Sequence, residues 1–414
     1  MLRVEIAATG KEILSGRIAD SNSAWLAEQL RLAGAEASRL HAVGDEQPAL
    51  TELLLEIAHR TDLAIVTGGL GSTPDDITAR AATECSGRPL VRDPEALQSV
   101  KDFWGSKMSS RMPEEAVNQA LVPEDCLVLQ NPIGSAPGFG LSISGCQIYF
   151  LPGVPREMKR MFTDSVLPHI RSSFADELCP IRTHRMNVFG LTESEASRRL
   201  DDFHQLHPRI ELGYRTLFPR IQLCLYAYQT ETSEEEMQQA KQLILERLGA
   251  NVVSAVDESM PEVIGRLLRE RDATLSLAES CTGGLISRRI TSVAGSSDYF
   301  SLSTVTYSNP AKTSLLGVSE STLQNCGAVH QETAKEMAEG MQRLSGSTFA
   351  LSTTGVAGPG GGTAQKPVGT VCIGLAWPGG STTRHLQWDS GDRLTNQSFF
   401  AECTMDLLRR RLSG

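Results

Sequence analysis

Apolar residues in the first 170 positions follow two patterns that alternate along the chain. Continuous apolar runs at Leu2–Ala8 and 62–67 predict buried strands. Apolar residues at helical spacing over 23–33 and 49–59 predict amphipathic helices, the first of which ends at Gly34. Strands that alternate with helices predict an open α/β sheet with parallel strands, in which ligands bind at the carboxyl ends of the strands.

A second pattern occupies residues 171–255. Residues 185–189 read as a strand, and apolar positions alternate with others over 221–225, as in a half-exposed strand. Capping boxes at Thr192–Glu195 and Ser233–Glu236 each open a predicted helix. Two strand–helix units predict a small α+β domain that links its neighbours.

The remaining residues, 256–414, return to alternating strands and helices. Helices are predicted over 260–270, 285–290 and 331–344 and at the C-terminus, and strands over 273–277, 303–307 and 348–354 and after Pro367. We therefore expect three domains at 1–170, 171–255 and 256–414, which agrees with a length of 414 residues.

Composition narrows the possible environments and partners. The net charge of −10 argues against a general nucleic-acid binder. The nine cysteines are scattered and form no C-x-x-C pair, which argues against a disulfide framework or a zinc knuckle and favours a reducing compartment. The N-terminus lacks the layout of a signal peptide, and no apolar run is long enough to span a bilayer. We expect a cytoplasmic protein without membrane or nucleic-acid partners.

The stretch Ala278–Gly284 carries the densest chemistry in the chain. It places Ser280, Cys281 and Thr282 on a glycine-rich turn between a predicted strand and a predicted helix. Free backbone N–H groups and the helix dipole favour negative charge at such a turn. This suits a nucleophile beside a developing oxyanion, or a bound phosphate. A plain helix N-cap would use the same residue types.

The loops that follow the first two predicted strands suggest a second site. The second strand runs into 68–78, in which Gly68, Gly69 and Gly71 allow close approach of an anion and Asp75 and Asp76 can hold Mg²⁺. Helix capping by the two aspartates is the alternative. The loop after the first strand adds Glu12 and Asp20 as further candidate metal ligands. Rigid turns at 131–138 and 151–157 complete this set of loops.

The motifs TGKEIL, GGLGSTPDD, NPIGSAPG and LPGVPREM, in this order, resemble the N-terminal, molybdopterin-binding-like domain of the CinA family. The resemblance implies a three-layer domain that hydrolyses ADP-ribose with a divalent metal, with Asn131 and Gly134 beside the substrate. Ser72 stands where the family usually has Pro, which we expect to be tolerated. Residues 171–255 are similar to the family's KH-like domain and imply a dimer contact, although no G-x-x-G loop is placed to clamp RNA.

The motifs AESCTGG, GSSDYF, TYSNPAK, TTGVAGP and KPVGTV resemble the C-terminal domain of the same family over the whole segment. That domain is a nicotinamide-nucleotide amidase, which converts nicotinamide mononucleotide (NMN) to nicotinate mononucleotide and ammonia. The resemblance assigns the nucleophile to Ser280 and further functional positions to Tyr307, Lys312 and Thr354. His330 stands where the family usually has Ser.

These residue types also agree with amide hydrolysis on chemical grounds. Ser280 needs a base, and Lys312 can serve if burial lowers its pKa, with no cofactor. Tyr307 would relay the proton or hold the lysine. Cys281 is the rival nucleophile, and Lys312 as an ordinary surface residue is the alternative to its catalytic role. The backbone N–H groups of Gly283 and Gly284 would bind the oxyanion. Thr354, with Gly355 and Gly358 of the loop 355–362, would bind the nucleotide phosphate.

We thus expect a cytoplasmic, homodimeric enzyme of pyridine-nucleotide salvage with two activities. Its partners would be small nucleotides, NMN and ADP-ribose. In one alternative, the first half is a molybdopterin-type binding module without hydrolytic activity. In another, the chain is a competence-related interaction protein, which its acidic charge disfavours.

Overall fold

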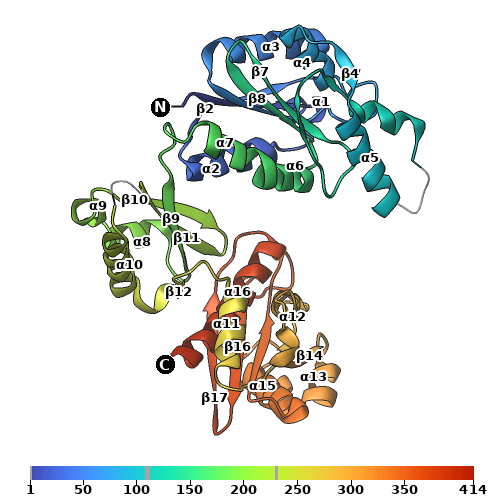
Figure 1. Ribbon diagram of the computed structural model, residues 1–414. Helices are drawn as coiled ribbons and strands as arrows, with labels where there is room; N and C mark the ends of the chain where they lie inside the picture. Colours follow the sequence, from blue (N-terminus) through green and yellow to red (C-terminus); the bar gives the residue numbers. More distant parts are fainter. Residues whose placement is uncertain (1, 108–111, 229–231) are drawn as a thin grey trace. The chain divides into compact units, whose positions relative to one another are not determined.

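The computed structural model describes residues 2–107, 112–228 and 232–414. The chain folds into two compact units, Met1–Thr183 with Ala227–Thr232, and His184–Tyr226 with Ser233–Gly414. The predicted α/β class is confirmed, because each unit contains a sheet with parallel strands that is flanked by helices (Figure 1).

The first unit is built on a six-stranded mixed sheet. Its spatial order is β2 (Ala37–Val43), β1 (Val4–Thr9), β3 (Leu63–Thr67), β8 (Cys146–Leu151), β7 (Gly138–Ile143) and β6 (Leu127–Leu129). Strands β2, β1, β3 and β8 run parallel to one another. Strand β7 pairs antiparallel with β8, and β6 pairs antiparallel with β7. Strands β4 (Leu90–Arg92) and β5 (Leu121–Pro123) form a separate pair.

Helices cover both faces of this sheet, which gives three layers (Figure 1). One face carries α3 (Gln47–Arg60) and α4 (Thr78–Ser86), and the other carries α2 (Ser21–Ala33), α6 (Pro155–Met161) and α7 (Leu167–Ser173). The remaining helical segments are α1 (Lys11–Leu14), α5 (Pro94–Lys107), η1 (Glu114–Ala120) and η2 (Phe162–Val166). The strands β1 and β3 are completely buried, as their unbroken apolar runs predict.

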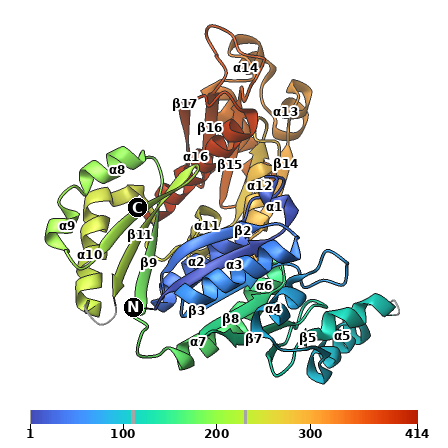
Figure 2. The ribbon, with the colours of Figure 1, turned by 90° about the horizontal axis from the view of Figure 1, so that it is seen from above.

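A four-stranded sheet lies in the middle of the sequence. Its order is β10 (Glu211–Leu217), β11 (Arg220–Tyr228), β9 (Ile181–Val188) and β12 (Val252–Ser254). Its helices are α8 (Glu193–Arg199), α9 (Phe203–Leu206), α10 (Glu234–Leu248) and η3 (Gly249–Asn251). Figure 2 shows α8 and α10 together on one side of β9 and β11. The predicted capping box at Thr192 is present, with both of its reciprocal hydrogen bonds to Glu195.

The C-terminal sheet has five strands in the order β14 (Phe300–Val305), β13 (Leu275–Glu279), β15 (Phe349–Gly355), β16 (Thr370–Trp377) and β17 (Gly380–Gln387). The first three strands are parallel to one another, whereas β16 pairs antiparallel with β15, and β17 pairs antiparallel with β16. The helices are α11 (Met260–Arg269), α12 (Leu285–Thr291), α13 (Asn309–Leu316), α14 (Glu320–Asn325), α15 (Gln331–Ser345) and α16 (Arg393–Ser413), with the 3₁₀ turn η4 (Ser296–Asp298).

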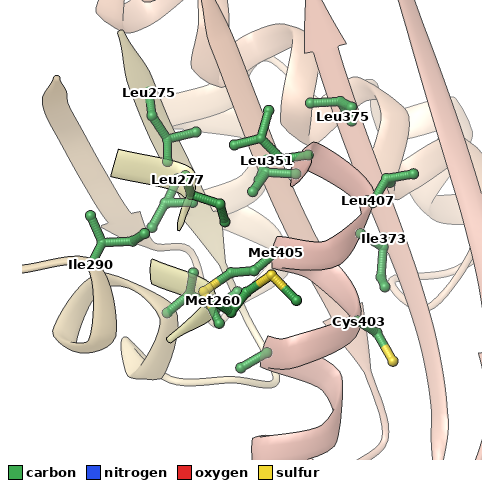
Figure 3. Packing of buried hydrophobic residues seen from close by; sticks show 14 of the residues in the cluster. Met260, Leu275, Leu277, Ile290, Leu351, Ile373, Leu375, Cys403, Met405 and Leu407 are labelled. Atoms are coloured by element: carbon green, nitrogen blue, oxygen red, sulfur yellow. The ribbon is translucent and has the colours of Figure 1, made fainter. Parts of the chain in front are cut away.

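The main C-terminal core lies between this sheet and α11, α12 and α16 (Figure 3). Leu277 and Leu351 of the sheet face Met405 of α16 and Met260 of α11 there, and all four side chains are buried. A smaller cluster packs α13 and α15 on the opposite face, through residues such as Leu316 and Met337. The short turn after β13 is therefore held between two packed layers, which fixes its position relative to β14 and β15.

Candidate active site

The turn after β13 brings Ser280 next to Lys312. The Lys312 amine lies 3.1 Å from Ser280 Oγ and 2.7 Å from the carbonyl oxygen of Thr306, to which it donates. Both side chains are buried, since Ser280 is 8% exposed and Lys312 only 1%. Burial lowers the pKa of Lys312. The structure thus assembles the predicted serine–lysine pair, and Lys312 is not an ordinary surface residue.

Lys312 reaches Ser280 because its helix begins directly after β14. Ser308 caps α13 by accepting a hydrogen bond from the N–H of Ala311, and Pro310 stands in the first turn. Lys312 then lies on the buried side of the helix, together with Leu316. Burial is the largest influence on the pKa of Lys312 and lowers it, and the electrostatic effect of the neighbouring Cys281 opposes this only in part.

Cys281 faces the protein interior. It is 4% exposed and belongs to the main C-terminal core. Burial raises the pKa of its thiol to about 12. The thiolate that a cysteine nucleophile requires is therefore strongly disfavoured, and the geometry favours Ser280 over Cys281.

The N–H groups of Gly283 and Gly284 already have acceptors within the protein. Gly283 N donates to the carbonyl oxygen of Ser280 at 3.1 Å, and Gly284 N donates to Glu279 Oε2 at 3.0 Å. The expectation that these two groups are free to bind an oxyanion is therefore wrong for this structure. The carboxylate of Glu279 takes the place that an anionic ligand would occupy at the N-terminus of α12.

Glu279 is a residue whose importance the sequence did not indicate. It is 1% exposed, and its oxygens accept five hydrogen bonds. Three come from backbone N–H groups of Gly284, Ile286 and Ser287, and two from the hydroxyls of Thr282 and Ser287. Such a carboxylate fixes the start of α12 and hence the turn that carries Ser280.

Tyr307 lies apart from the serine–lysine pair. Its side chain is 64% exposed, and its hydroxyl accepts a hydrogen bond from Arg393 Nη2 at 3.2 Å. These contacts do not support the expected proton relay or grip on the lysine. Arg393 also donates to the carbonyl oxygen of Gly358 at 2.5 Å, so Tyr307, Arg393 and the glycine loop are linked.

Thr354 is buried at the end of β15, and its hydroxyl donates to the carbonyl oxygen of Ala328 at 2.7 Å. This contact ties β15 to the loop that precedes α15. His330 ends that loop and is the N-cap of α15, where its Nδ1 accepts a hydrogen bond from the N–H of Glu332 at 3.1 Å. The His330 ring thus makes the type of capping hydrogen bond that a serine hydroxyl makes at other helices.

The loops after β1 and β3 form a cleft of about 380 Å³ in the first unit. Its lining contains many of the residues predicted for the metal and substrate: Glu12, Gly68, Gly69, Gly71, Asp75 and Asp76. Gly68 and Gly69 have positive φ angles, and a Cβ at Gly71 would overlap the carboxylate of Asp76. The glycines therefore allow the close turn that brings Asp76 to the cleft.

Three other residues predicted for this site have structural contacts instead. Asp20 is the N-cap of α2 and accepts a hydrogen bond from Ser23 N at 2.9 Å, so it does not line the cleft. Asn131 is buried, accepts from Gly134 N at 2.9 Å and donates to Glu157 Oε2 at 2.7 Å. Asn131 and Gly134 thus shape the loop that carries the lining residue Ser135.

The two aspartates at the cleft do not cap the following helix. The N-cap of α4 is Ile77, which makes no side-chain capping bond, and Asp76 accepts instead from the N–H and hydroxyl of Thr73. Thr9 also lines the cleft, and its buried hydroxyl has no partner within the described residues. This hydroxyl lies against Gly68 and Gly69, where a Cβ on either glycine would approach it closely.

Comparison with known proteins now identifies the family. A CinA-like protein of Desulforapulum autotrophicum is 45% identical over 417 residues, which cover 99% of this chain and 98% of the relative. A CinA-like protein of Desulfosudis oleivorans is 43% identical over 410 residues, which cover 99% of this chain and 99% of the relative. The chain belongs to the CinA family. Family models of the CinA C-terminal domain and of a "Probable molybdopterin binding domain" match residues 257–412 and 5–172.

Solved CinA structures are similar to parts of this chain. The competence/damage inducible protein CihA from Agrobacterium tumefaciens is 35% identical, over 39% of this chain and 99% of its own, with a TM-score of 0.36. The CinA protein of Thermoplasma acidophilum, whose function is stated to be unknown, is 28% identical over 41% of this chain and 96% of its own, with a TM-score of 0.37. No described helix of the present CinA protein is both long and apolar enough to cross a membrane.

Proposed function

We propose that this CinA protein is a bifunctional hydrolase of pyridine-nucleotide salvage, whose C-terminal domain converts NMN to nicotinate mononucleotide and ammonia. The observation that carries the proposal is the buried amine of Lys312, 3.1 Å from Ser280 Oγ. An amine with a lowered pKa can take the proton of a serine hydroxyl, and a serine alkoxide can attack an unactivated amide. The motifs shared with nicotinamide-nucleotide amidases support NMN as the substrate.

The proposed reaction uses this geometry. Neutral Lys312 accepts the proton of Ser280, and Ser280 Oγ attacks the carboxamide carbon of NMN. Collapse of the tetrahedral intermediate breaks the C–N bond, and Lys312 returns the proton to the leaving group, which departs as ammonia. Water, deprotonated by Lys312, then cleaves the serine ester and releases the carboxylate of nicotinate mononucleotide.

The nucleotide phosphate would bind near Arg393. Arg393 is half-buried and donates to the carbonyl oxygen of Gly358 and to the hydroxyl of Tyr307, both of which are neutral acceptors. A phosphate is a better partner for a guanidinium than either, because it accepts charge-assisted bidentate hydrogen bonds. We therefore assign Arg393 and Tyr307 to substrate binding, beside the glycine loop that contains Gly355 and Gly358.

Ammonia release from NMN by the purified protein tests this proposal. The product must be identified as nicotinate mononucleotide, because ammonia alone would not distinguish NMN from a contaminating amide. Lys312→Met is the matched negative control, since it keeps an unbranched side chain of similar length without the amine. NMN turnover equal in Lys312→Met and the unaltered protein would reject the mechanism, and its absence from both would reject the substrate.

For the N-terminal domain we propose hydrolysis of ADP-ribose to AMP and ribose 5-phosphate. The lining carboxylates support a polar, metal-assisted reaction in the cleft. Within the described residues, no group of three or more His, Cys, Asp or Glu side chains is arranged to hold a metal ion. The cleft carboxylates Asp76 with Asp75 or Glu12 fit a cation such as Mg²⁺, which one or two carboxylates can hold together with the substrate's phosphates. When bound, such a cation would polarise the pyrophosphate.

Metal-dependent turnover of ADP-ribose separates this activity from that of a binding module without hydrolysis. AMP should appear with Mg²⁺ and stop when a chelator is added. Tight ADP-ribose binding without AMP would favour the binding module. We further propose that the protein works in the cytoplasm as a homodimer. The molar mass of the purified protein, measured by light scattering, would test the dimer.

A further inference from the structure

The β10–β11 hairpin of the middle sheet contacts the segment that precedes α16 through aromatic stacking. The Phe218 ring at its tip lies 5.3 Å from the Trp388 ring with an interplanar angle of 20°. Trp388 in turn lies 4.3 Å from the ring of Phe399 on α16. Both views show the hairpin reaching this segment (Figures 1 and 2). The hairpin and α16 belong to the same compact unit.

The segment 388–393, which we call the Trp388 segment, is bonded to the glycine loop of the amidase site. Trp388 N donates to the carbonyl oxygen of Gly369 at 3.0 Å, and Gly369 N donates to that of Val356 at 2.8 Å. A Cβ at Gly369 would overlap the backbone of Trp388. This close approach means that Trp388 and the glycine loop cannot shift independently.

A second set of contacts connects the same segment to the residues next to Gly358. Asn396, which is completely buried, accepts from Ser390 N at 2.9 Å and donates to Asp389 Oδ1 at 2.8 Å. Its amide also donates to the carbonyl oxygen of Ala357 at 3.1 Å. The Trp388 segment ends in Arg393, which bonds to the carbonyl oxygen of Gly358. The position of Arg393 therefore depends on how the Trp388 segment is held.

We infer that Phe218 is a positioning residue of the amidase site: the middle-domain hairpin holds the Trp388 segment, and through it Arg393, in the arrangement that binds the anionic group of the nucleotide. This inference rests on the proposed amidase function. Phe218 is 48% exposed despite its stack, so its ring covers Trp388 rather than filling a core. The middle domain thereby becomes part of the substrate site.

The inference predicts a particular kinetic signature. Without the ring of Phe218, the Trp388 segment would occupy the binding-competent arrangement for a smaller fraction of the time, and the apparent affinity falls in proportion to that fraction. Ser280 and Lys312 lie on other elements, so the chemical step should be unaffected. Phe218→Ala should raise the KM for NMN about three- to tenfold, the range expected from the loss of one aromatic pair, with kcat within about twofold.

The test uses the full-length protein with steady-state NMN kinetics. Phe218→Tyr keeps the ring and should restore KM, whereas Leu206→Ala, which removes another half-exposed apolar side chain from the middle domain, should leave it unchanged. Hydrolysis of ADP-ribose by each variant checks that the first unit is intact. If Phe218→Ala does not fold, Phe218→Leu takes its place with the same expected rise in KM.

The outcomes separate this inference from the proposed function. Absence of NMN turnover in the unaltered protein rejects the function itself. With turnover present, a raised KM that Phe218→Tyr restores supports the positioning role. An unchanged KM, a fall in kcat alone, or a rise in KM that Phe218→Tyr does not restore would overturn it.

Discussion

Replacement of Glu279 by glutamine tests whether this carboxylate holds the serine turn in place. In the native protein its Oε2 accepts from the hydroxyl of Thr282 and the N–H groups of Gly284 and Ile286, and its Oε1 accepts from the N–H and hydroxyl of Ser287. A glutamine retains one acceptor oxygen, and its NH₂ group cannot accept from Ser287 N. The substitution changes few atoms, so the effect isolates charge and hydrogen bonding.

The magnitude follows from these contacts. A buried N–H without an acceptor costs about 1–3 kcal/mol, and each of the three remaining bonds loses about 0.5–1 kcal/mol when its acceptor is no longer charged. Such contributions in one network are not additive, so we expect a loss of about 3 kcal/mol in the free energy of unfolding. For a cooperative unit of 150–250 residues this corresponds to a fall in Tm of about 6–12 °C.

Calorimetry of the full-length protein, together with the temperature at which NMN turnover is lost, measures this effect. Glu332→Gln is the matched control, because Glu332 is exposed and its surface ion pair with Lys335, at 3.4 Å, is worth at most about 1 kcal/mol. The activity against ADP-ribose should retain its temperature dependence. Equal Tm shifts in Glu279→Gln and Glu332→Gln would refute the role assigned to Glu279.

Four further predictions concern the two sites. Lys312→Arg keeps the charge but cannot deprotonate, so NMN should bind while turnover is lost; a normal rate would exclude the base role. Because burial lowers the pKa of Lys312, the neutral base accumulates as pH rises through that pKa, and kcat/KM for NMN should rise with it. At pH values between the lowered pKa of Lys312 in the folded protein and its pKa in the unfolded chain, the folded state binds fewer protons than the unfolded state. The free energy of unfolding should therefore also rise with pH in this range, and Lys312→Met should abolish that rise. Asp76→Ala should abolish ADP-ribose hydrolysis but not NMN turnover, and full pyrophosphatase activity would move the metal to other carboxylates. Arg393→Ala should raise the KM for NMN at least tenfold, as measured by steady-state kinetics, and an unchanged KM would remove Arg393 from phosphate binding.

Elements with strong local patterns could be predicted from the sequence. The apolar runs of β1 and β3 and the helical spacing of α2 and α3 all lie where their periodicity places them. The edge strand β2 was not predicted, because much of Ala37–Val43 is exposed and polar and its pairing with β1 is a tertiary interaction. The predicted strand at 303–307 also differs, since β14 ends at Val305.

The site was predictable where its chemistry is local. Ser280 lies on a strand-to-helix turn, as its neighbours in the sequence indicate. Glu279 and Arg393 were missed for different reasons. A glutamate at the end of a strand gives no sign that it will fold back onto the next helix, and Arg393 meets Gly358 only because α16 packs against the sheet. Asp392 caps α16 by accepting from the N–H of Thr395, so an aspartate here is a local sign of where the helix begins, but it gives no sign of what Arg393 contacts.

The most direct test of the central claim compares Ser280→Ala with Cys281→Ala in NMN turnover. Ser280→Ala should reduce turnover by several orders of magnitude, on the scale of about 10⁶ for loss of a serine nucleophile. Cys281→Ala should remain active and lose up to about 1 kcal/mol of stability, because it removes only a small buried side chain. Neither change should affect ADP-ribose hydrolysis. An inactive Cys281→Ala, or an active Ser280→Ala, would contradict the assignment of Ser280 as the nucleophile.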